Sequence, residues 1–194
     1  MNTSRVEAFS DGVLAIVITI MVLEMTAPEE PTWDGLRQVL PIFLSYLLSF
    51  VYVGIFWNNH HHLVQLAGKV DGTVLWANLH LLFWLSLIPF STRWMQQNEF
   101  AQVPVLIYGL DLLLAAVAFQ LLRMALVRQD GPDGDLAQAL RGERKGKYSP
   151  VLYLTGMGAT LIQPWLGLAV YAAVALLWLL PQRRMERKAA ELEG

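Results

Sequence analysis

The chain has 194 residues, of which 55% are hydrophobic and only 15% are charged, whereas a soluble domain carries about 25% charged residues. This composition excludes an ordinary soluble enzyme, and the abundant aromatic residues exclude a disordered chain because they offer ample apolar surface to bury. The sequence has no cysteine, so disulfides, thiolate metal sites and cysteine nucleophiles are excluded, and a net charge of −2 gives no field that would attract nucleic acid.

Six segments are predicted to span a membrane, because a spanning helix needs about 20 mostly apolar residues. They cover residues 6–25, 39–64, 74–94, 103–127, 150–163 and 165–180. The last two belong to one uncharged run, residues 148–182, which would be about 52 Å long as a single helix. Gln163-Pro164 lies near its middle, and a proline ends or kinks a helix. Two short spans fit this run, as does a tightly turned re-entrant pair. We predict an all-helical, six-span membrane protein with one domain, residues 1–194.

The distribution of basic residues predicts the orientation. Six spans place both termini on one side of the membrane, and twelve of the fourteen Lys and Arg residues fall on that side. The positive-inside rule therefore predicts cytoplasmic N- and C-termini, a cytoplasmic loop at 128–147 and a charged cytoplasmic tail at 182–194. The opposite side holds acidic residues that form either a solvated loop or a rim that concentrates cations: Glu24, Glu29, Glu30, Asp34 and Glu99.

The first predicted span contains Ser10 and Asp11 near its cytoplasmic edge. Ionisable groups within a span are costly and face either the protein interior or water. We interpret this pair as a hydrogen-bonded clasp between helices, since buried polar groups often join helices in membrane bundles. The alternative is a cytoplasmic gate or an ion-entry site.

Further along the same span, apolar residues and one threonine recur at i, i+3, i+4 and i+7: Ile16, Thr19, Ile20 and Leu23. This spacing places them in one stripe on a helix. Taken alone, an aliphatic stripe indicates helix packing or lipid contact. If four copies of the helix met on an axis, the stripe would form stacked apolar rings, which can gate a pore by dewetting.

Several other polar residues are candidates for the partner of the clasp. His60, His61 and His62 are consecutive and point in different directions on a helix, so a polar cluster is predicted there and a metal site is not. His60 or His61 could reach the clasp, and so could His80 or Asn78 in the third span. Asp111, inside the fourth span, serves either in a structural hydrogen bond or in a proton relay.

The pattern Arg-x-x-x-Phe-Ser-Asp, formed by Arg5, Phe9, Ser10 and Asp11, resembles the signature of the transmembrane protein 175 family of potassium channels. The likeness is to its bacterial six-span members and extends over nearly the whole chain. Further residues that carry it are Trp57, His61, Trp76, Asn78 and the segment Pro89-Phe90-Ser91-Thr92.

The resemblance implies a homotetramer in which the first span lines a central pore. It implies a constriction of aliphatic side chains at Ile16, followed by Ile20 and Leu23, and a layer of hydroxyls at Thr19 that contributes to potassium preference. The Arg5–Asp11 motif becomes a structural or gating element. Its candidate partners are Trp57, His61, Trp76, Asn78 and His80. The sequence has no carbonyl-lined filter loop of the Thr-Val-Gly-Tyr-Gly kind.

The leading hypothesis is therefore a potassium-permeable channel, multi-pass in a bacterial inner membrane, that conducts monovalent cations passively and prefers K⁺ over Na⁺ modestly. No enzyme activity, metal, cofactor or nucleic-acid partner is expected. Two alternatives stay open. One is a proton-conducting channel or transporter that uses Asp11, His80 and Asp111. The other is a membrane scaffold that transports nothing.

Overall fold

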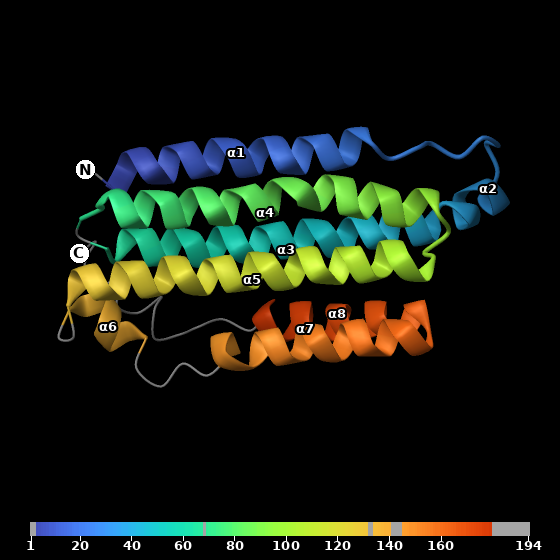
Figure 1. The fold of residues 1–194 in the computed structure, drawn as a ribbon. Coiled ribbons are helices and arrows are strands. Elements are labelled where there is room, and N and C mark those ends of the chain that lie inside the picture. Colours follow the sequence, from blue (N-terminus) through green and yellow to red (C-terminus); the bar gives the residue numbers. More distant parts are fainter. Residues whose placement is uncertain (1–2, 68, 132–133, 141–144, 180–194) are drawn as a thin grey trace.

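The computed structural model describes residues 3–67, 69–131, 134–140 and 145–179, and every regular element in these ranges is a helix (Figure 1). In chain order they are α1 (Thr3–Leu23), α2 (Trp33–Gln38), α3 (Leu40–Gln65), α4 (Gly72–Gln97), α5 (Gln102–Asp130), α6 (Asp135–Ala139), α7 (Lys145–Ile162) and α8 (Pro164–Leu179). The long helices α1, α3, α4 and α5 run side by side, and the short helices α2 and α6 lie at opposite ends of the bundle.

Local chemistry fixes several helix ends. The Asp71 carboxylate accepts a hydrogen bond from the Val74 backbone N–H at 2.9 Å, and the Thr32 hydroxyl accepts one from the Gly35 N–H at 3.1 Å. Each bond satisfies an N–H group that the first turn of a helix cannot pair internally. Pro164 opens α8, where its missing N–H costs no hydrogen bond, so the chain turns sharply after α7.

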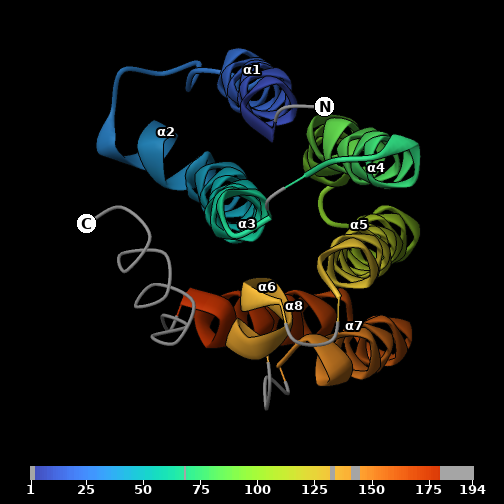
Figure 2. The same ribbon diagram turned by 90° about the vertical axis from the view of Figure 1, so that its left-hand side faces the viewer.

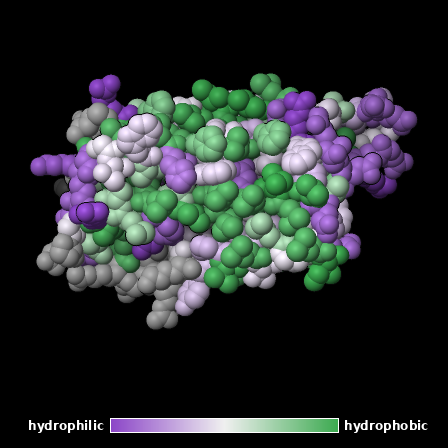
Figure 3. Space-filling model, viewed as in Figure 1, coloured by the Kyte–Doolittle hydropathy of each residue, from purple (hydrophilic) through white to green (hydrophobic). Residues whose placement is uncertain are grey.

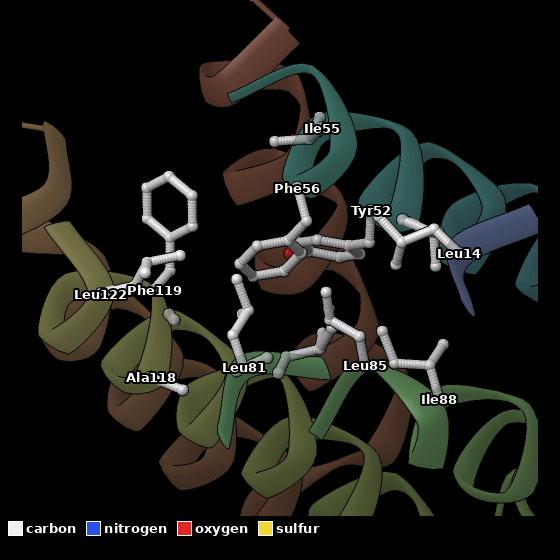
Figure 4. Packing of buried hydrophobic residues seen from close by; sticks show 14 of the residues in the cluster. Leu14, Tyr52, Ile55, Phe56, Leu81, Leu85, Ile88, Ala118, Phe119 and Leu122 are labelled. Carbon is white, nitrogen blue, oxygen red and sulfur yellow. The ribbon is translucent and has the colours of Figure 1, made fainter. Parts of the chain in front are cut away.

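The core lies between the long helices. Figure 4 shows side chains from α1, α3, α4 and α5 converging, with Leu14, Tyr52, Phe56 and Leu81 among them. Inside this core, one hydroxyl group lies within hydrogen-bonding distance of two others. The Ser49 hydroxyl lies 2.8 Å from that of Thr92 and 3.0 Å from that of Tyr108, so one cluster of hydroxyls joins α3, α4 and α5.

Helices α7 and α8 form a hairpin that packs against α5 and α3. The Tyr52 hydroxyl of α3 donates to the backbone carbonyl of Tyr171 in α8 at 2.6 Å. At the other end of the hairpin, the Gln102 amide donates to the carbonyls of Thr160 and Leu161, which are free because α7 ends there. In the end view the hairpin and α1 lie on opposite sides of the bundle (Figure 2).

The prediction of six transmembrane helices is wrong. Four of the described helices, α1, α3, α4 and α5, are long and apolar enough to cross a membrane. Helix α8 has 16 residues and extends about 24 Å, short of an apolar layer of about 30 Å. Helix α7 has 18 residues but begins with Lys145 and Lys147, which lower its apolar character. The break at Gln163-Pro164 thus divides the uncharged run into helices that do not meet the requirements of a span.

The surface agrees with a membrane setting. Apolar residues gather over the middle of the face in Figure 3, and hydrophilic residues lie toward both ends. The predicted tail at 182–194 lies outside the described residues, as do residues 132–133 and 141–144 of the predicted loop.

Close packing of the hairpin gives a first prediction. A methyl group added at Gly156 of α7 would overlap the ring of Tyr171 in α8, whereas one added at Gly158 would meet nothing within 4 Å. Gly156→Ala should therefore destabilise the protein by about 1–3 kcal/mol through overpacking. Thermal unfolding in detergent, followed by tryptophan fluorescence, measures this change.

Gly158→Ala is the matched control on the same helix. It should leave the melting temperature unchanged or raise it, because alanine favours a helix over glycine by up to about 1 kcal/mol. Equal effects of the two substitutions would contradict this account of the hairpin.

Candidate functional site

One face of α1 is anchored to α4 and α3 through its buried residues Val6, Ser10, Leu14, Val17 and Met21. In the N-terminal half of this anchored face, the Ser10 hydroxyl donates to the Val6 carbonyl at 2.8 Å and accepts from the Asn78 amide at 3.0 Å. The Asn78 carbonyl oxygen lies 2.7 Å from His60 Nε2. Because that oxygen can only accept, His60 Nε2 carries the hydrogen. The chain of bonds links α1, α4 and α3.

A second set of contacts joins α1 to α3 at the same end. The Trp57 indole N–H donates to the Asp11 carboxylate at 2.9 Å. His61 stacks on Trp57 with ring centroids 6.1 Å apart, and its Nδ1 lies 2.6 Å from a carboxylate oxygen of Glu7. Two separate sets of contacts therefore join α1 to its neighbours at this end. We call them the arm through Ser10, which includes Asn78 and His60, and the arm through Asp11, which includes Trp57.

The opposite, open face of α1 is apolar and uncovered. The exposed fractions of Ile16, Ile20 and Leu23 are 59%, 41% and 82%, and Phe9 is also exposed. Thr19 lies on the same face, and its hydroxyl donates its hydrogen to the Ile16 carbonyl at 2.8 Å. This bond leaves the lone pairs of the hydroxyl oxygen available to a cation. The stripe inferred from spacing thus lies on the exposed side of α1, away from the described helices that bury its other face. The roles given to its residues stay predictions.

The structure divides the Arg5–Asp11 motif between these two faces. Ser10 is buried and Asp11 is half-buried beside Trp57, whereas Arg5 and Phe9 are exposed. Among the candidate partners of the motif, Asn78 contacts Ser10 and Trp57 contacts Asp11 directly.

Three other candidates are placed differently. His61 reaches Glu7 and stacks on Trp57, so its link to Asp11 passes through the indole. His80 Nε2 accepts from the Trp84 indole at 2.9 Å on the same helix. Trp76 is 75% exposed. Sequence reasoning missed Glu7, although it precedes Asp11 by one helical turn and hence shares its face.

Two further polar groups have structural contacts. The Asp111 carboxylate is buried and accepts from the Ser91 hydroxyl of α4 at 2.8 Å. Of the consecutive histidines, His60 turns to Asn78 and His61 to Glu7. The described residues contain no group of three or more side chains that could hold a metal ion.

Comparison with known proteins identifies the family. Residues 5–89, from the start of the motif through α1, α3 and most of α4, match the sequence model of the family described as endosomal/lysosomal potassium channel TMEM175. A protein of Chryseobacterium named as a potassium channel is 48% identical over 191 residues, which is 98% of this chain and all of that protein. The chain belongs to the TMEM175 family.

A solved structure supports this assignment at the level of the fold. The crystal structure of a TMEM175 homologue from Chamaesiphon minutus, described as a lysosomal potassium-selective channel homologue, matches with a TM-score of 0.81. Sequence identity is 28%, and the match covers 93% of this chain and 97% of that chain. The mouse TMEM175 protein, named as an endosomal/lysosomal proton channel, is 30% identical over 112 residues, which is 55% of this chain and 22% of the mouse protein.

The arm through Ser10 generates a second prediction. Asn78→Leu would remove the bonds to both Ser10 and His60. Ser10 would keep its bond to the Val6 carbonyl, but His60 Nε2 would be left buried without its partner, so we expect a loss of about 1–3 kcal/mol in stability. In a double-mutant cycle, Ser10→Ala should add little once Asn78 is lost, because the two residues share one interaction. Thermal unfolding of the detergent-solubilised protein measures both effects.

Asn59→Leu serves as the control, because among the described residues the Asn59 amide donates within its own helix, to the Ile55 carbonyl at 2.7 Å. Fully additive losses for Ser10 and Asn78 would show that the arm does not join α1 to α4.

Proposed function

We propose that this protein is a potassium-permeable cation channel that assembles as a homotetramer, with the open face of α1 lining the ion path. The observation that carries the proposal is the contrast between the two faces of α1: one is bonded to α3 and α4, and the other is exposed over most of its length. Membership of the TMEM175 family and relatives named as potassium channels support potassium as the permeant ion.

In this proposal Ile16 forms the constriction and Ile20 and Leu23 form further rings toward the outer end. A ring of four isoleucine side chains offers no partner to water, so a narrow ring stays dry and blocks ions, whereas a slightly wider one wets and lets a hydrated cation pass. Small movements of α1 can therefore open and close the path. Conduction of this kind is passive and needs no cofactor.

Thr19 supplies the polar layer. Its side chain lies one turn beyond Ile16, and its hydroxyl hydrogen is occupied by the Ile16 carbonyl. Four such oxygens at one level can replace part of the water shell of a cation. We infer that K⁺, which gives up its water more readily than Na⁺, is preferred, and that the preference is modest because the ring supplies few oxygens.

The charge distribution supports an orientation with both termini in the cytoplasm of a bacterial cell and the channel in its inner membrane. The end of the bundle where α1 begins and α5 ends carries several basic residues: Arg5, Lys69, Arg123 and Arg128. At the opposite end the two basic residues are paired with acids: Arg37 with Asp34 at 3.0 Å and Arg93 with Glu24 at 3.2 Å.

Proton conduction is the second candidate, since vertebrate relatives are named as proton channels. The groups considered for it do not form one path. In the described chain Asp11 bonds to Trp57, His80 to Trp84 and Asp111 to Ser91, and none of these bonds joins two of the three groups.

Flux across liposomes tests the proposal directly. Purified protein should dissipate a K⁺ gradient when a counter-ion pathway is supplied, and should do so at equal pH on both sides. Flux driven by a pH gradient without potassium would favour the proton channel instead, and the absence of any cation flux from assembled protein would indicate a scaffold.

Widening the constriction should raise conductance. Ile16→Asn replaces an apolar ring with polar amides that hold water, so K⁺ flux should increase several-fold. Val22→Asn is the control, because Val22 is also exposed but lies about 120° around the helix from Ile16. Flux that is unchanged or lower in Ile16→Asn would remove Ile16 as the constriction.

Removing the hydroxyl layer should weaken ion discrimination. Thr19→Val keeps the shape of the side chain but loses its oxygen, so the preference for K⁺ over Na⁺ should fall. The reversal potential under bi-ionic conditions measures the preference, with Thr26→Val, in the loop after α1, as the control. A reversal potential equal to that of the wild type would exclude Thr19 from selectivity.

A further inference from the structure

The outer end of α1 is joined to α4 by an ion pair. Arg93 Nη1 lies 3.2 Å from Glu24 Oε1, and the Glu24 side chain is the more sheltered of the two, 23% exposed against 50%. Glu24 directly follows α1, and its backbone N–H donates to the Ile20 carbonyl at 3.1 Å. The helical hydrogen bonding therefore continues into Glu24, and a force on its side chain acts on the turn that carries Ile20.

Helix α4 thus contacts α1 through polar groups at two levels. Asn78 bonds to Ser10 near the inner end, and Arg93 bonds to Glu24 at the outer end. The two α4 residues are separated by about 22 Å along the helix axis. Pro89 lies between them inside α4. Since proline has no N–H, the carbonyl one turn earlier lacks its helical partner, and α4 is easier to bend there.

A hollow opens on one side of the contact between the outer ends of α1 and α4. This open hollow lies beside the ion pair, lined by Ile20 and Glu24 of α1 and by residues of α4 that include Pro89, Phe90 and Arg93. By contrast, the anchored face of α1 is buried through Met21. The ion pair therefore restrains the outer end of α1 at the hollow between the two helices.

We propose that Arg93 is a positioning residue, which fixes the outer end of α1 through Glu24 and thereby sets the position of the Ile20 and Leu23 side chains. This inference rests on the proposed function, in which the open face of α1 lines the ion path. Bending of α4 at Pro89 then moves Arg93 relative to Asn78, and the ion pair passes that movement to the outer half of α1.

The proposal and a purely electrostatic role predict different directions for the change in K⁺ flux. If Glu24 and Arg93 acted separately on the local concentration of cations, Glu24→Gln would lower K⁺ flux and Arg93→Gln would raise it. If instead the ion pair works as one contact that holds α1 to α4, which we call the latch, each substitution breaks the same contact. Both substitutions then change K⁺ flux in the same direction. We expect changes of about two- to fivefold, the size of an equilibrium shift that a partly exposed ion pair supplies.

The experiment measures K⁺ flux in liposomes for Glu24→Gln, Arg93→Gln, the double variant, and the exchanged pair Glu24→Arg with Arg93→Glu. The double variant should not exceed the larger single effect, and the exchanged pair should return flux toward the wild-type value. Asp34→Asn and Arg37→Gln are matched controls, because this pair has the same charges at the same end but lies wholly within α2. Neither control should change flux.

Opposite signs, additive effects or failure of the exchanged pair would overturn the latch. Ile16→Asn in the same preparations separates this failure from that of the proposed function: if it changes flux, the ion path stands and only the latch is lost. If Ile16→Asn has no effect on flux, the proposal that α1 lines the ion path is wrong. The latch proposal, which rests on it, is then wrong as well. A double-mutant cycle in thermal unfolding tests the contact independently of flux, and additive losses there would also overturn it.

Discussion

Helix α1 is bonded to its neighbours on one face and exposed on the other. A helix in a membrane gains little from burying apolar side chains against other apolar side chains, because lipid is equally apolar. Polar contacts must therefore fix its position and rotation. Ser10 and Asp11 provide them by bonding to α4 and α3, and this sets which side chains of α1 remain uncovered.

The remainder of the bundle supports that arrangement from the other side. Helices α3, α4 and α5 share buried hydroxyls at Ser49, Thr92 and Tyr108, and the α7–α8 hairpin packs against α5 on the side away from α1. A rigid frame matters here, because the partners of α1 can orient it only if they hold their own positions. The hairpin thus supports the site indirectly, by packing against α5 and α3.

Helix α4 makes two different polar contacts with α1. Its inner half contributes Asn78 to the buried clasp and its outer half contributes Arg93 to an exposed ion pair. The two contacts differ in strength and in access to solvent, since a buried amide left unpaired is costly whereas an exposed ion pair exchanges easily with water. The N-terminal end of α1 is accordingly held by the more costly contact to break, and its C-terminal end by the weaker one.

Sequence alone determined the helical, membrane-embedded character of the chain, because apolar length and scarce charge follow directly from composition. It also determined that Ile16, Thr19, Ile20 and Leu23 share a face, since spacing on a helix is arithmetic. The packing of the helices was needed to show that this face is exposed, that Asp11 pairs with Trp57 while His80 pairs with Trp84, and that Glu7 takes part. These pairings depend on how each helix is rotated against its neighbours, which no local pattern encodes. The structure likewise reduced six predicted spans to four helices fit to cross, because the turn at Pro164 fixes where α7 and α8 end and begin.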